Sequence, residues 1–233
     1  TDRMKVLKFG GSSVGNAENI RLVKKILEKQ DEPCVVVISA FDGVTDSLIH
    51  AAQLARNQHV AYKEVATVLR SIHLEMIKEL IRGPVQKAST EEANTLLDDF
   101  TVVLQGIYQL RDLSAKTLDL VLSFGERLSA TIVAKYMEGS QYIDARELIR
   151  TDDQFGNTTV DIKVSNEAIK LRLKNPKQLT VLPGFIASDP LGETTTLGRG
   201  GSDYTAAILA AALGVKGLEI WTDGDGFMTA DPT

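Results

Sequence analysis

Residues 6–38 decide the fold of this chain and read VLKFGGSSVGNAENIRLVKKILEKQDEPCVVVI. The apolar residues 6–9 predict a strand that stops at a glycine-rich turn, and residues 16–29 carry apolar side chains at helical spacing. The β-branched run at residues 34–38 predicts a second strand that is buried on both faces. Strand, glycine turn, helix and buried strand form the opening of a parallel α/β sheet.

A long helical region follows the second strand. Four segments place apolar side chains at helical spacing: residues 45–56, 62–81, 90–110 and 118–137. Gly83-Pro84 breaks the pattern, and Gly125 interrupts the last segment. This is too much helix for one crossover between parallel strands. We therefore expect an all-helical insertion, about residues 45–138, that packs beside the sheet within one domain spanning residues 1–233.

The alternation of strands and helices returns after this insertion. The pattern predicts helices at residues 161–173 and 204–213 and strands at residues 141–144, 179–184 and 218–222. Asp189-Pro190-Leu191-Gly192 suits a type I turn in a hairpin, because proline fits its second position and glycine its fourth. These elements extend the parallel sheet and make the fold class α/β.

The charge and composition of the chain limit its partners. It has 26 basic and 31 acidic residues, a net charge of −5, which disfavours nucleic-acid binding. No apolar stretch is long enough for a transmembrane helix, and the first residues lack a signal-peptide pattern. The single cysteine, Cys34, can form neither an internal disulfide nor a zinc site by itself. We expect a cytoplasmic globular protein with no nucleic-acid or membrane partner.

The first glycine-rich turn has the chemistry of a phosphate cradle. Its N–H groups lie between a strand and a helix N-terminus, and Lys8 at the strand end would point over the turn. It is not a Walker A loop, because Asn16 and Ala17 stand where lysine and Ser/Thr belong. It also lacks the glycine fingerprint of dinucleotide-binding turns. The alternative is a structural lysine beside a tight turn.

The second glycine-rich turn reads Gly198-Arg199-Gly200-Gly201-Ser202-Asp203. Three glycines allow a ligand to approach the backbone closely, and Arg199 can bind a carboxylate or a phosphate through two hydrogen bonds. The alternative is a flexible loop in which Ser202 or Asp203 caps the alanine-rich helix that follows. Such a cap leaves the glycines around the arginine unexplained, so we favour a ligand-binding loop.

Two weaker signals complete the candidates. Glycine at position 125 costs a helix roughly 1 kcal/mol relative to alanine, which indicates close packing or a ligand near Glu126. The alternative there is a helix boundary with an exposed Glu126–Arg127 pair. Trp221-Thr222-Asp223-Gly224 lies where a strand ends, at the edge where open α/β sheets bind ligands, although Asp-Gly also marks ordinary turns. Four further side chains are interpreted as packing or surface residues: His50, His59, His73 and Cys34.

Together these motifs resemble one family, the aspartate kinases of the amino-acid kinase superfamily, over essentially the whole chain. The long second glycine motif and its order relative to the others make the resemblance specific. The resemblance rests on these stretches of sequence: Lys8-Phe9-Gly10-Gly11-Ser12-Ser13-Val14, Ser39-Ala40 to Thr45, Phe124-Gly125-Glu126, Phe155-Gly156, Gly184-Phe185-Ile186, Thr196 to Ala206, and Trp221-Thr222-Asp223.

The resemblance implies a fold and a reaction. The fold is the amino-acid kinase fold, a three-layer sandwich around a mainly parallel sheet. Aspartate kinases transfer the γ-phosphoryl group of ATP to the β-carboxylate of L-aspartate, which gives 4-phospho-L-aspartate and opens the pathway to lysine, threonine, methionine and isoleucine. The resemblance implies ATP with Mg²⁺ bound through its phosphates, no metal site made of side chains, and a homo-oligomeric full-length protein.

The resemblance also implies roles for individual residues. Lys8 and Asp203 would be catalytic: Lys8 would neutralise charge on the transferring phosphoryl group, and Asp203 would lie beside Lys8 and set the geometry. Arg199 would bind the α-carboxylate of the substrate and Glu126 its α-ammonium. The remaining residues implied for the amino acid are Thr45 and Ser202, which would orient the β-carboxylate, and Gly200. Those implied for the nucleotide are Gly10, Gly11, Ser12, Thr222, Asp223, Phe227 and Asp231.

The family continues with a lysine-containing nucleotide motif and regulatory ACT domains, which this sequence lacks. We therefore expect the chain to hold the aspartate site and part of the ATP site. Two other hypotheses stay open: a related kinase that phosphorylates glutamate or N-acetylglutamate, and a ligand-sensing module without turnover. Glu126 argues for a substrate with a free amino group, which N-acetylglutamate lacks.

Overall fold

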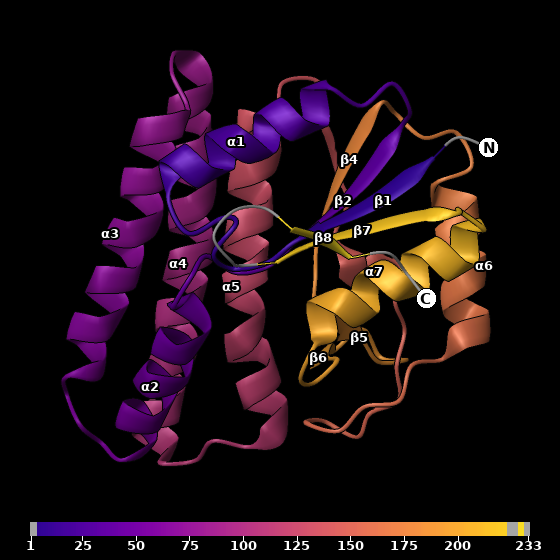
Figure 1. The fold of residues 1–233 in the computed structure, drawn as a ribbon. Coiled ribbons are helices and arrows are strands. Elements are labelled where there is room, and N and C mark those ends of the chain that lie inside the picture. Colours follow the sequence, from indigo (N-terminus) through magenta and orange to yellow (C-terminus); the bar gives the residue numbers. More distant parts are fainter. Residues whose placement is uncertain (1–3, 223–227, 231–233) are drawn as a thin grey trace.

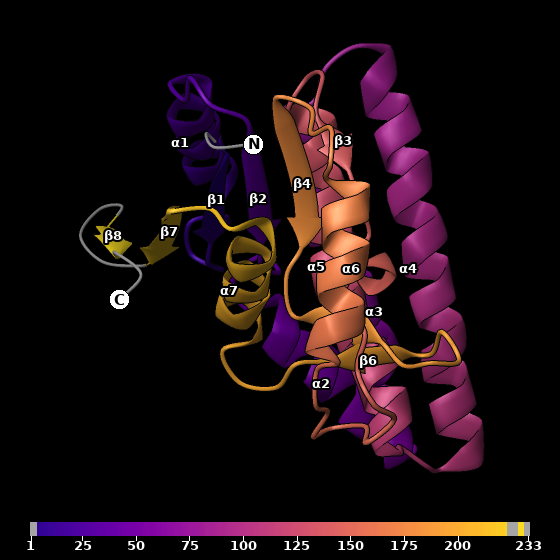
Figure 2. The same ribbon diagram turned by 90° about the vertical axis from the view of Figure 1, so that its right-hand side faces the viewer.

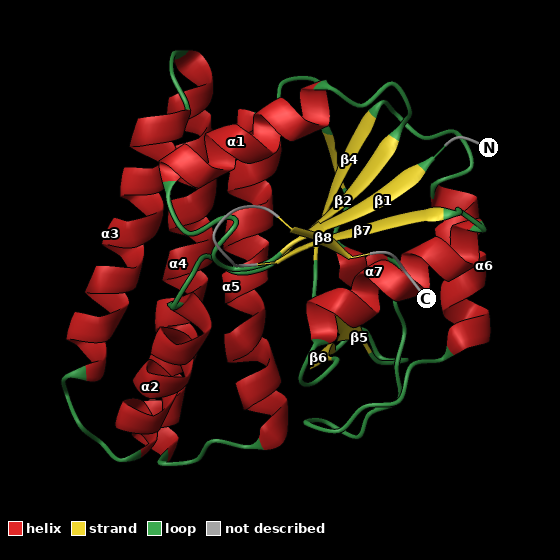
Figure 3. Cartoon of the chain, viewed as in Figure 1, coloured by secondary structure: helices red, strands yellow, loops and turns green. Residues whose placement is uncertain are grey.

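A central sheet organises the molecule, with strand order β3-β4-β2-β1-β7-β8. Figure 3 shows β4, β2, β1 and β7 side by side in this order. The computed structural model describes residues 4–222 and 228–230. Neighbouring strands are parallel except for β7 and β8, which are antiparallel. The strands of this sheet are β1 (Lys5–Phe9), β2 (Cys34–Ile38), β3 (Gln141–Tyr142), β4 (Leu179–Pro183), β7 (Gly217–Thr222) and β8 (Met228–Ala230).

Helices cover both faces of the sheet and make three layers, as Figures 1 and 2 show. One face packs on α1 (Ala17–Glu28) and α5 (Ala115–Tyr136), and the other on α6 (Ile162–Arg172) and α7 (Gly201–Leu213). Successive strand residues point to opposite faces, so Leu7 and Val36 join the first core while Val6, Val35 and Val37 join the second. The predicted three-layer α/β fold is confirmed.

Four helices between β2 and β3 stand beside the sheet in Figure 1. They are α2 (Val44–Arg56), α3 (Tyr62–Leu80), α4 (Pro84–Leu110) and α5. Their apolar side chains share one core with α1 and the nearer face of the sheet. Helix α4 begins at Pro84 and not at residue 90, because proline fits the first turn of a helix, where its missing N–H is not needed.

Helix α5 runs through Gly125 without a break, so the alternative of a helix boundary there is wrong. A Cβ atom at Gly125 would lie 3.0 Å from the Cβ of Ala40 and 3.2 Å from Cδ1 of Leu48. Glycine therefore lets α5 approach the segment that follows β2. This close approach brings Glu126, the next residue, against the end of the sheet.

A hairpin precedes the last helix. Strands β5 (Ile186–Ser188) and β6 (Thr194–Thr196) pair antiparallel, and the Gly192 N–H donates to the Asp189 carbonyl at 3.0 Å. The predicted hairpin is confirmed, and a short 3₁₀ helix, η1 (Ala145–Glu147), contacts β5. Helix α7 begins at Gly201, with Gly200 as its N-cap, so the alternative of a side-chain cap from Ser202 or Asp203 is wrong.

The order of the strands creates a binding edge. The chain leaves β1 toward β2 on one side, and β7 later pairs with the other side of β1. Ligands of open α/β sheets bind outside the carboxyl ends of the strands at such a switch point. The carboxyl ends of β1, β2 and β4 therefore mark the place to look for function. Among the described residues, no helix is long and apolar enough to cross a membrane.

Candidate active site

A cleft of about 720 Å³ opens at the carboxyl edge of the sheet. Its walls come from the end of β1, the segment after β2, helix α5, the hairpin and the start of α7. The structure thus brings together side chains that lie almost 200 positions apart in the sequence, such as Lys8 and Asp203. The cleft is lined by every residue predicted for catalysis or amino-acid binding: Lys8, Thr45, Glu126, Arg199, Gly200, Ser202 and Asp203.

An ion pair joins the two residues predicted to be catalytic. The Lys8 Nζ lies 2.8 Å from Oδ1 of Asp203, with the Lys8 side chain 11% exposed and the Asp203 side chain 48% exposed. Lys8 comes from β1 and Asp203 from the first turn of α7. The amine also lies over the glycine turn, since a Cβ at Gly10 would be 3.2 Å from it. Lys8 is therefore a fixed cation between this turn and the cleft.

The turn after β1 offers backbone donors beside this cation. The Gly10 N–H already donates to the carbonyl of Trp221 at 3.3 Å, so it is not free for a ligand. In the described part of the chain, no acceptor faces the N–H groups of Gly11 and Ser12. The turn that carries them leads into α1, and the Asn19 side chain in the first turn of α1 donates to the Ser12 carbonyl at 2.8 Å, so the N-terminal end of a helix, which favours an anion, lies close by. Of the three predicted phosphate donors, Gly11 and Ser12 keep that capacity.

Glu126 is a buried carboxyl with one oxygen left over. The residue is 5% exposed, and its Oε1 accepts a hydrogen bond from the Ala40 N–H at 3.4 Å. Its Oε2 is buried and has no hydrogen-bond partner within the described residues. Burial raises the pKa of Glu126 to about 8, against smaller opposing contributions from backbone hydrogen bonds. Such a carboxyl is suited to a cationic ligand, which would supply the missing partner and favour ionisation.

The second glycine turn presents Arg199 at the mouth of the cleft. Gly198 and Gly200 have φ angles of +76° and +71°, which residues with a Cβ atom rarely adopt. Arg199 is exposed, and within the described residues its guanidinium forms no ion pair. The turn leads directly into α7, whose N-terminal end also favours anions. Arg199 is thus available for a ligand carboxylate or phosphate.

Sequence reasoning missed several residues that line the cleft. Asp119 lies seven residues before Glu126, so the two share one face of α5, and this spacing could have revealed it. Thr196 ends β6 beside Asp119, with its Oγ1 donating to Asp119 Oδ1 at 2.9 Å. Phe185 has a φ angle of +75°, a left-handed conformation that the sequence does not predict for a phenylalanine.

The residues predicted for the nucleotide are described in part. Thr222 is the last residue of β7, next to β1 in the sheet. Asp223, Phe227 and Asp231 lie outside the described residues. Within residues 4–222 and 228–230, no group of three or more His, Cys, Asp or Glu side chains is placed to hold a metal ion.

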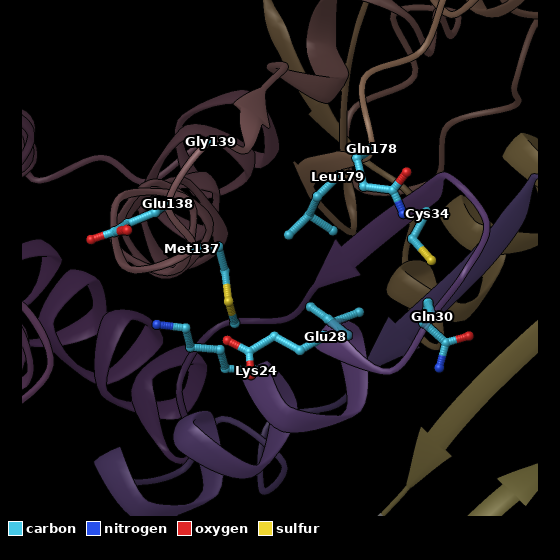
Figure 4. Close-up of a pocket in the computed structure, with 10 residues that line it drawn as sticks. Lys24, Glu28, Gln30, Cys34, Met137, Glu138, Gly139, Gln178 and Leu179 are labelled. Atoms are coloured by element: carbon cyan, nitrogen blue, oxygen red, sulfur yellow. The ribbon is translucent and has the colours of Figure 1, made fainter.

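A second hollow, of about 600 Å³, lies at the opposite edge of the sheet (Figure 4). Cys34 and Leu179, the first residues of β2 and β4, form part of its lining, as do Lys24 from α1 and Met137 beyond α5. Burial raises the pKa of the Cys34 thiol to about 11, so the thiol is a poor nucleophile at neutral pH. Because this hollow is at the amino edge of the strands, the first cleft is the better candidate for catalysis.

Comparisons with known proteins show the family to which the chain is related. Residues 3–233 match the model of the amino acid kinase family. The chain is 35% identical to aspartokinase 1, chloroplastic, of Arabidopsis thaliana, over 98% of this chain and 41% of that protein. It is 36% identical to lysine-sensitive aspartokinase 3 of Escherichia coli, over 97% of this chain and 50% of that protein. The chain thus spans about half the length of the curated relatives it matches.

A solved structure is similar over nearly the whole chain. The structure of E. coli aspartokinase III in complex with aspartate and ADP has a TM-score of 0.86 and 33% identity, and the match covers 96% of this chain and 50% of that one. The similarity confirms the amino-acid kinase fold and the resemblance to aspartate kinases predicted from the sequence motifs.

Proposed function

The chain belongs to the amino acid kinase family, and on that premise we propose that it transfers the γ-phosphoryl group of ATP to the β-carboxylate of L-aspartate. The product is 4-phospho-L-aspartate, and ADP is released. The observation that carries this proposal is the buried Glu126 carboxyl, whose Oε2 has no hydrogen-bond partner among the described residues, in the same cleft as Arg199 and Lys8. A similar structure holding aspartate and ADP supports the choice of substrates.

The charges of the cleft match the charges of aspartate. Glu126 would accept the α-ammonium through Oε2, the oxygen left without a hydrogen-bond partner in the described residues. Arg199 would bind the α-carboxylate through two parallel hydrogen bonds. Thr45, in the first turn of α2, and Ser202, in the first turn of α7, would orient the β-carboxylate with their hydroxyls. A substrate without a free ammonium would leave Glu126 buried and unpaired, which costs binding free energy.

The transferring phosphoryl group would contact Lys8, on the β1 side of the cleft. An oxygen of the β-carboxylate attacks the γ-phosphorus, and the bond between that phosphorus and the β,γ-bridging oxygen breaks, so the electron pair leaves with ADP. The attacking carboxylate is already ionised at neutral pH, so the protein need supply neither a nucleophile nor a base. Lys8 would stabilise the charge on the transferring group, held in place by Asp203.

The nucleotide would lie across the ends of β1 and β7. Gly11 and Ser12 would donate their N–H groups to phosphate oxygens, and Thr222, Asp223, Phe227 and Asp231 would complete the nucleotide site. Mg²⁺ would be bound through the phosphates and would neutralise their charge. We place the protein in the cytoplasm, as a homo-oligomer in its full-length form, at the first step of lysine, threonine, methionine and isoleucine synthesis.

Ligand binding without nucleotide tests the proposal most directly. We expect ligand-observed NMR and calorimetry to detect binding of L-aspartate in preference to L-glutamate, and no binding of N-acetylated amino acids. Glu126→Gln keeps the acceptor for Ala40 but removes the charge, and should abolish aspartate binding. Thr131→Val is the matched control, because Thr131 is buried on α5 and its hydroxyl donates to the carbonyls of Arg127 and Leu128 in the same helix. Preferential binding of glutamate, or wild-type affinity in Glu126→Gln, would contradict the proposed substrate.

A further inference from the structure

Asp119 is a second buried carboxyl in the cleft, and the proposed reaction leaves it without a role. The residue is 2% exposed and lies on α5, on the same face as Glu126 and about 10 Å further along the helix axis. It lines the cleft together with Arg199. The substrate's ammonium already has Glu126 as its partner, so Asp119 needs another explanation.

The two oxygens of Asp119 hold two different segments. Oδ1 accepts a hydrogen bond from Oγ1 of Thr196 at 2.9 Å, and Oδ2 accepts one from the Gly156 N–H at 3.3 Å. The segments are also joined to each other, because Thr158 Oγ1 donates to the carbonyl of Thr196 at 2.6 Å. A single carboxyl thus fastens helix α5 to the end of β6 and to the loop around residue 156.

This attachment lies immediately before the turn that carries Arg199. The next residue, Leu197, donates its N–H to the carbonyl of Phe185 at 2.9 Å. Beyond it come Gly198 and Gly200, whose positive φ angles allow the turn its shape. The far side of the turn is held by α7. Arg199 therefore sits on a glycine turn whose near end is fixed to α5, the helix that also carries Glu126.

Burying the carboxyl of Asp119 carries a desolvation cost. Burial is the largest influence on the pKa of Asp119 and raises it, while the hydrogen bonds from Thr196 and Gly156 lower it. An apolar side chain of similar size could pack at this position without the desolvation cost. We therefore interpret the role of Asp119 as holding the segments around Gly156 and Thr196 in fixed positions relative to α5.

We propose that Asp119 is a positioning residue, which fixes the turn bearing Arg199 at the correct distance from Glu126. The two charges would then match the α-carboxylate and the α-ammonium of one amino acid, which lie on the same carbon atom. This positioning role rests on the proposed function. The hydrogen bonds from Thr196 and Gly156 to Asp119 can be tested without any ligand.

The first measurement is amide hydrogen exchange in Thr196→Val, an isosteric change that removes one of the two hydrogen bonds. We expect faster exchange at Gly156 and across residues 198–201 than in the wild type, with Thr196→Ser restoring slow exchange because it keeps the hydroxyl. Thr131→Val, on α5, serves as the control for the loss of a threonine hydroxyl that does not bond to Asp119. Unchanged exchange in both Thr196→Val and Asp119→Ala would overturn the proposed attachment.

The second measurement is a double-mutant cycle for L-aspartate binding. Thr196→Val should weaken binding about tenfold, the lower end of the cost of losing one hydrogen bond to a charged group, and Thr196→Ser should bind nearly as well as the wild type. If Asp119 acts through Arg199, then Thr196→Val should cause no further loss when Arg199 is already changed to alanine. An equal loss in both backgrounds would contradict the positioning role. A wild-type chain that does not bind aspartate would refute the proposed function and leave the exchange result to decide the attachment.

Discussion

The Ala40 N–H donates to Oε1 of Glu126 at 3.4 Å and so joins the segment after β2 to helix α5, across 86 positions of sequence. Ser129, one turn further along α5, donates its hydroxyl to the carbonyl of Ser39 at 2.7 Å. Two neighbouring backbone groups of one segment are therefore held by two side chains of one helix. This arrangement keeps Glu126 Oε1 occupied and leaves Oε2 for a ligand.

The affinity for L-aspartate should depend on pH through Glu126. The pKa of this carboxyl is raised to about 8 in the empty cleft, so it holds a proton at neutral pH and must release it to pair with an ammonium. Binding should therefore tighten as the pH rises from about 6 to 7.5, by up to about tenfold per pH unit. Calorimetry in buffers of different ionisation enthalpy should show proton release on binding. Affinity that stays flat over this range would show that Glu126 is already ionised or is not the partner.

Lys8→Met should strongly slow phosphoryl transfer but leave the fold intact. The change removes the cation that faces the transferring group, and the loss of one such stabilising group typically lowers the rate by about 100- to 1,000-fold. Because Asp203 is half exposed in its pair with Lys8, the stability should change by less than about 1 kcal/mol. ADP formation with aspartate and Mg-ATP gives the rate, and thermal unfolding gives the stability. A variant with more than a tenth of wild-type activity would remove Lys8 from the catalytic residues.

His73 should make the fold sensitive to acid. It is fully buried in α3, stacks on Phe41 with ring centroids 5.4 Å apart, and its Nδ1 pairs with the Leu69 carbonyl at 2.7 Å. Burial lowers the pKa of His73 from 6.5 to about 4. Between these values the unfolded chain binds the proton more tightly, so the stability present above pH 6.5 is lost as the pH falls toward 4.

A comparison of variants separates the loss of stability caused by His73 from the effects of other titrating groups. His73→Phe keeps a ring against Phe41 and removes the titration, so it should lose about 3 kcal/mol less than the wild type between neutral pH and pH 4. His50→Gln, at an exposed position of α2, should behave like the wild type. Urea unfolding at several pH values gives the comparison. Parallel curves for wild type and His73→Phe would mean that His73 is not protected from protons in the folded state.

Two glycines in helices should respond in opposite directions to alanine. Gly125→Ala places a methyl group 3.0 Å from the Cβ of Ala40, and such overpacking costs about 1–3 kcal/mol. Gly106→Ala, in α4, meets no atom within 4 Å and should stabilise the protein by up to about 1 kcal/mol through helix propensity. Chemical denaturation measures both. Equal effects at the two sites would show that helix propensity, and not the approach of α5 to Ala40, governs position 125.

Much of the fold could be predicted from the sequence because its signals are local. The β-branched run of β2, the apolar spacing of α1 and the Asp189–Gly192 turn each depend on neighbours a few positions away. The errors fall at element ends. The sequence pattern could not show that α7 begins at Gly201, because its first turn is stabilised by contacts with distant segments, such as Phe185 against Gly201.

The sequence by itself determined the α/β class, the parallel opening of the sheet and the list of charged and glycine-rich motifs that belong in a binding site. The tertiary structure alone decided which groups are paired and which remain available to a ligand. It showed that the Gly10 N–H is already occupied and that, among the described residues, Oε2 of Glu126 has no hydrogen-bond partner. The reason is that periodicity and turn chemistry act between near neighbours, whereas burial and hydrogen bonding of a side chain depend on residues that only folding brings into contact.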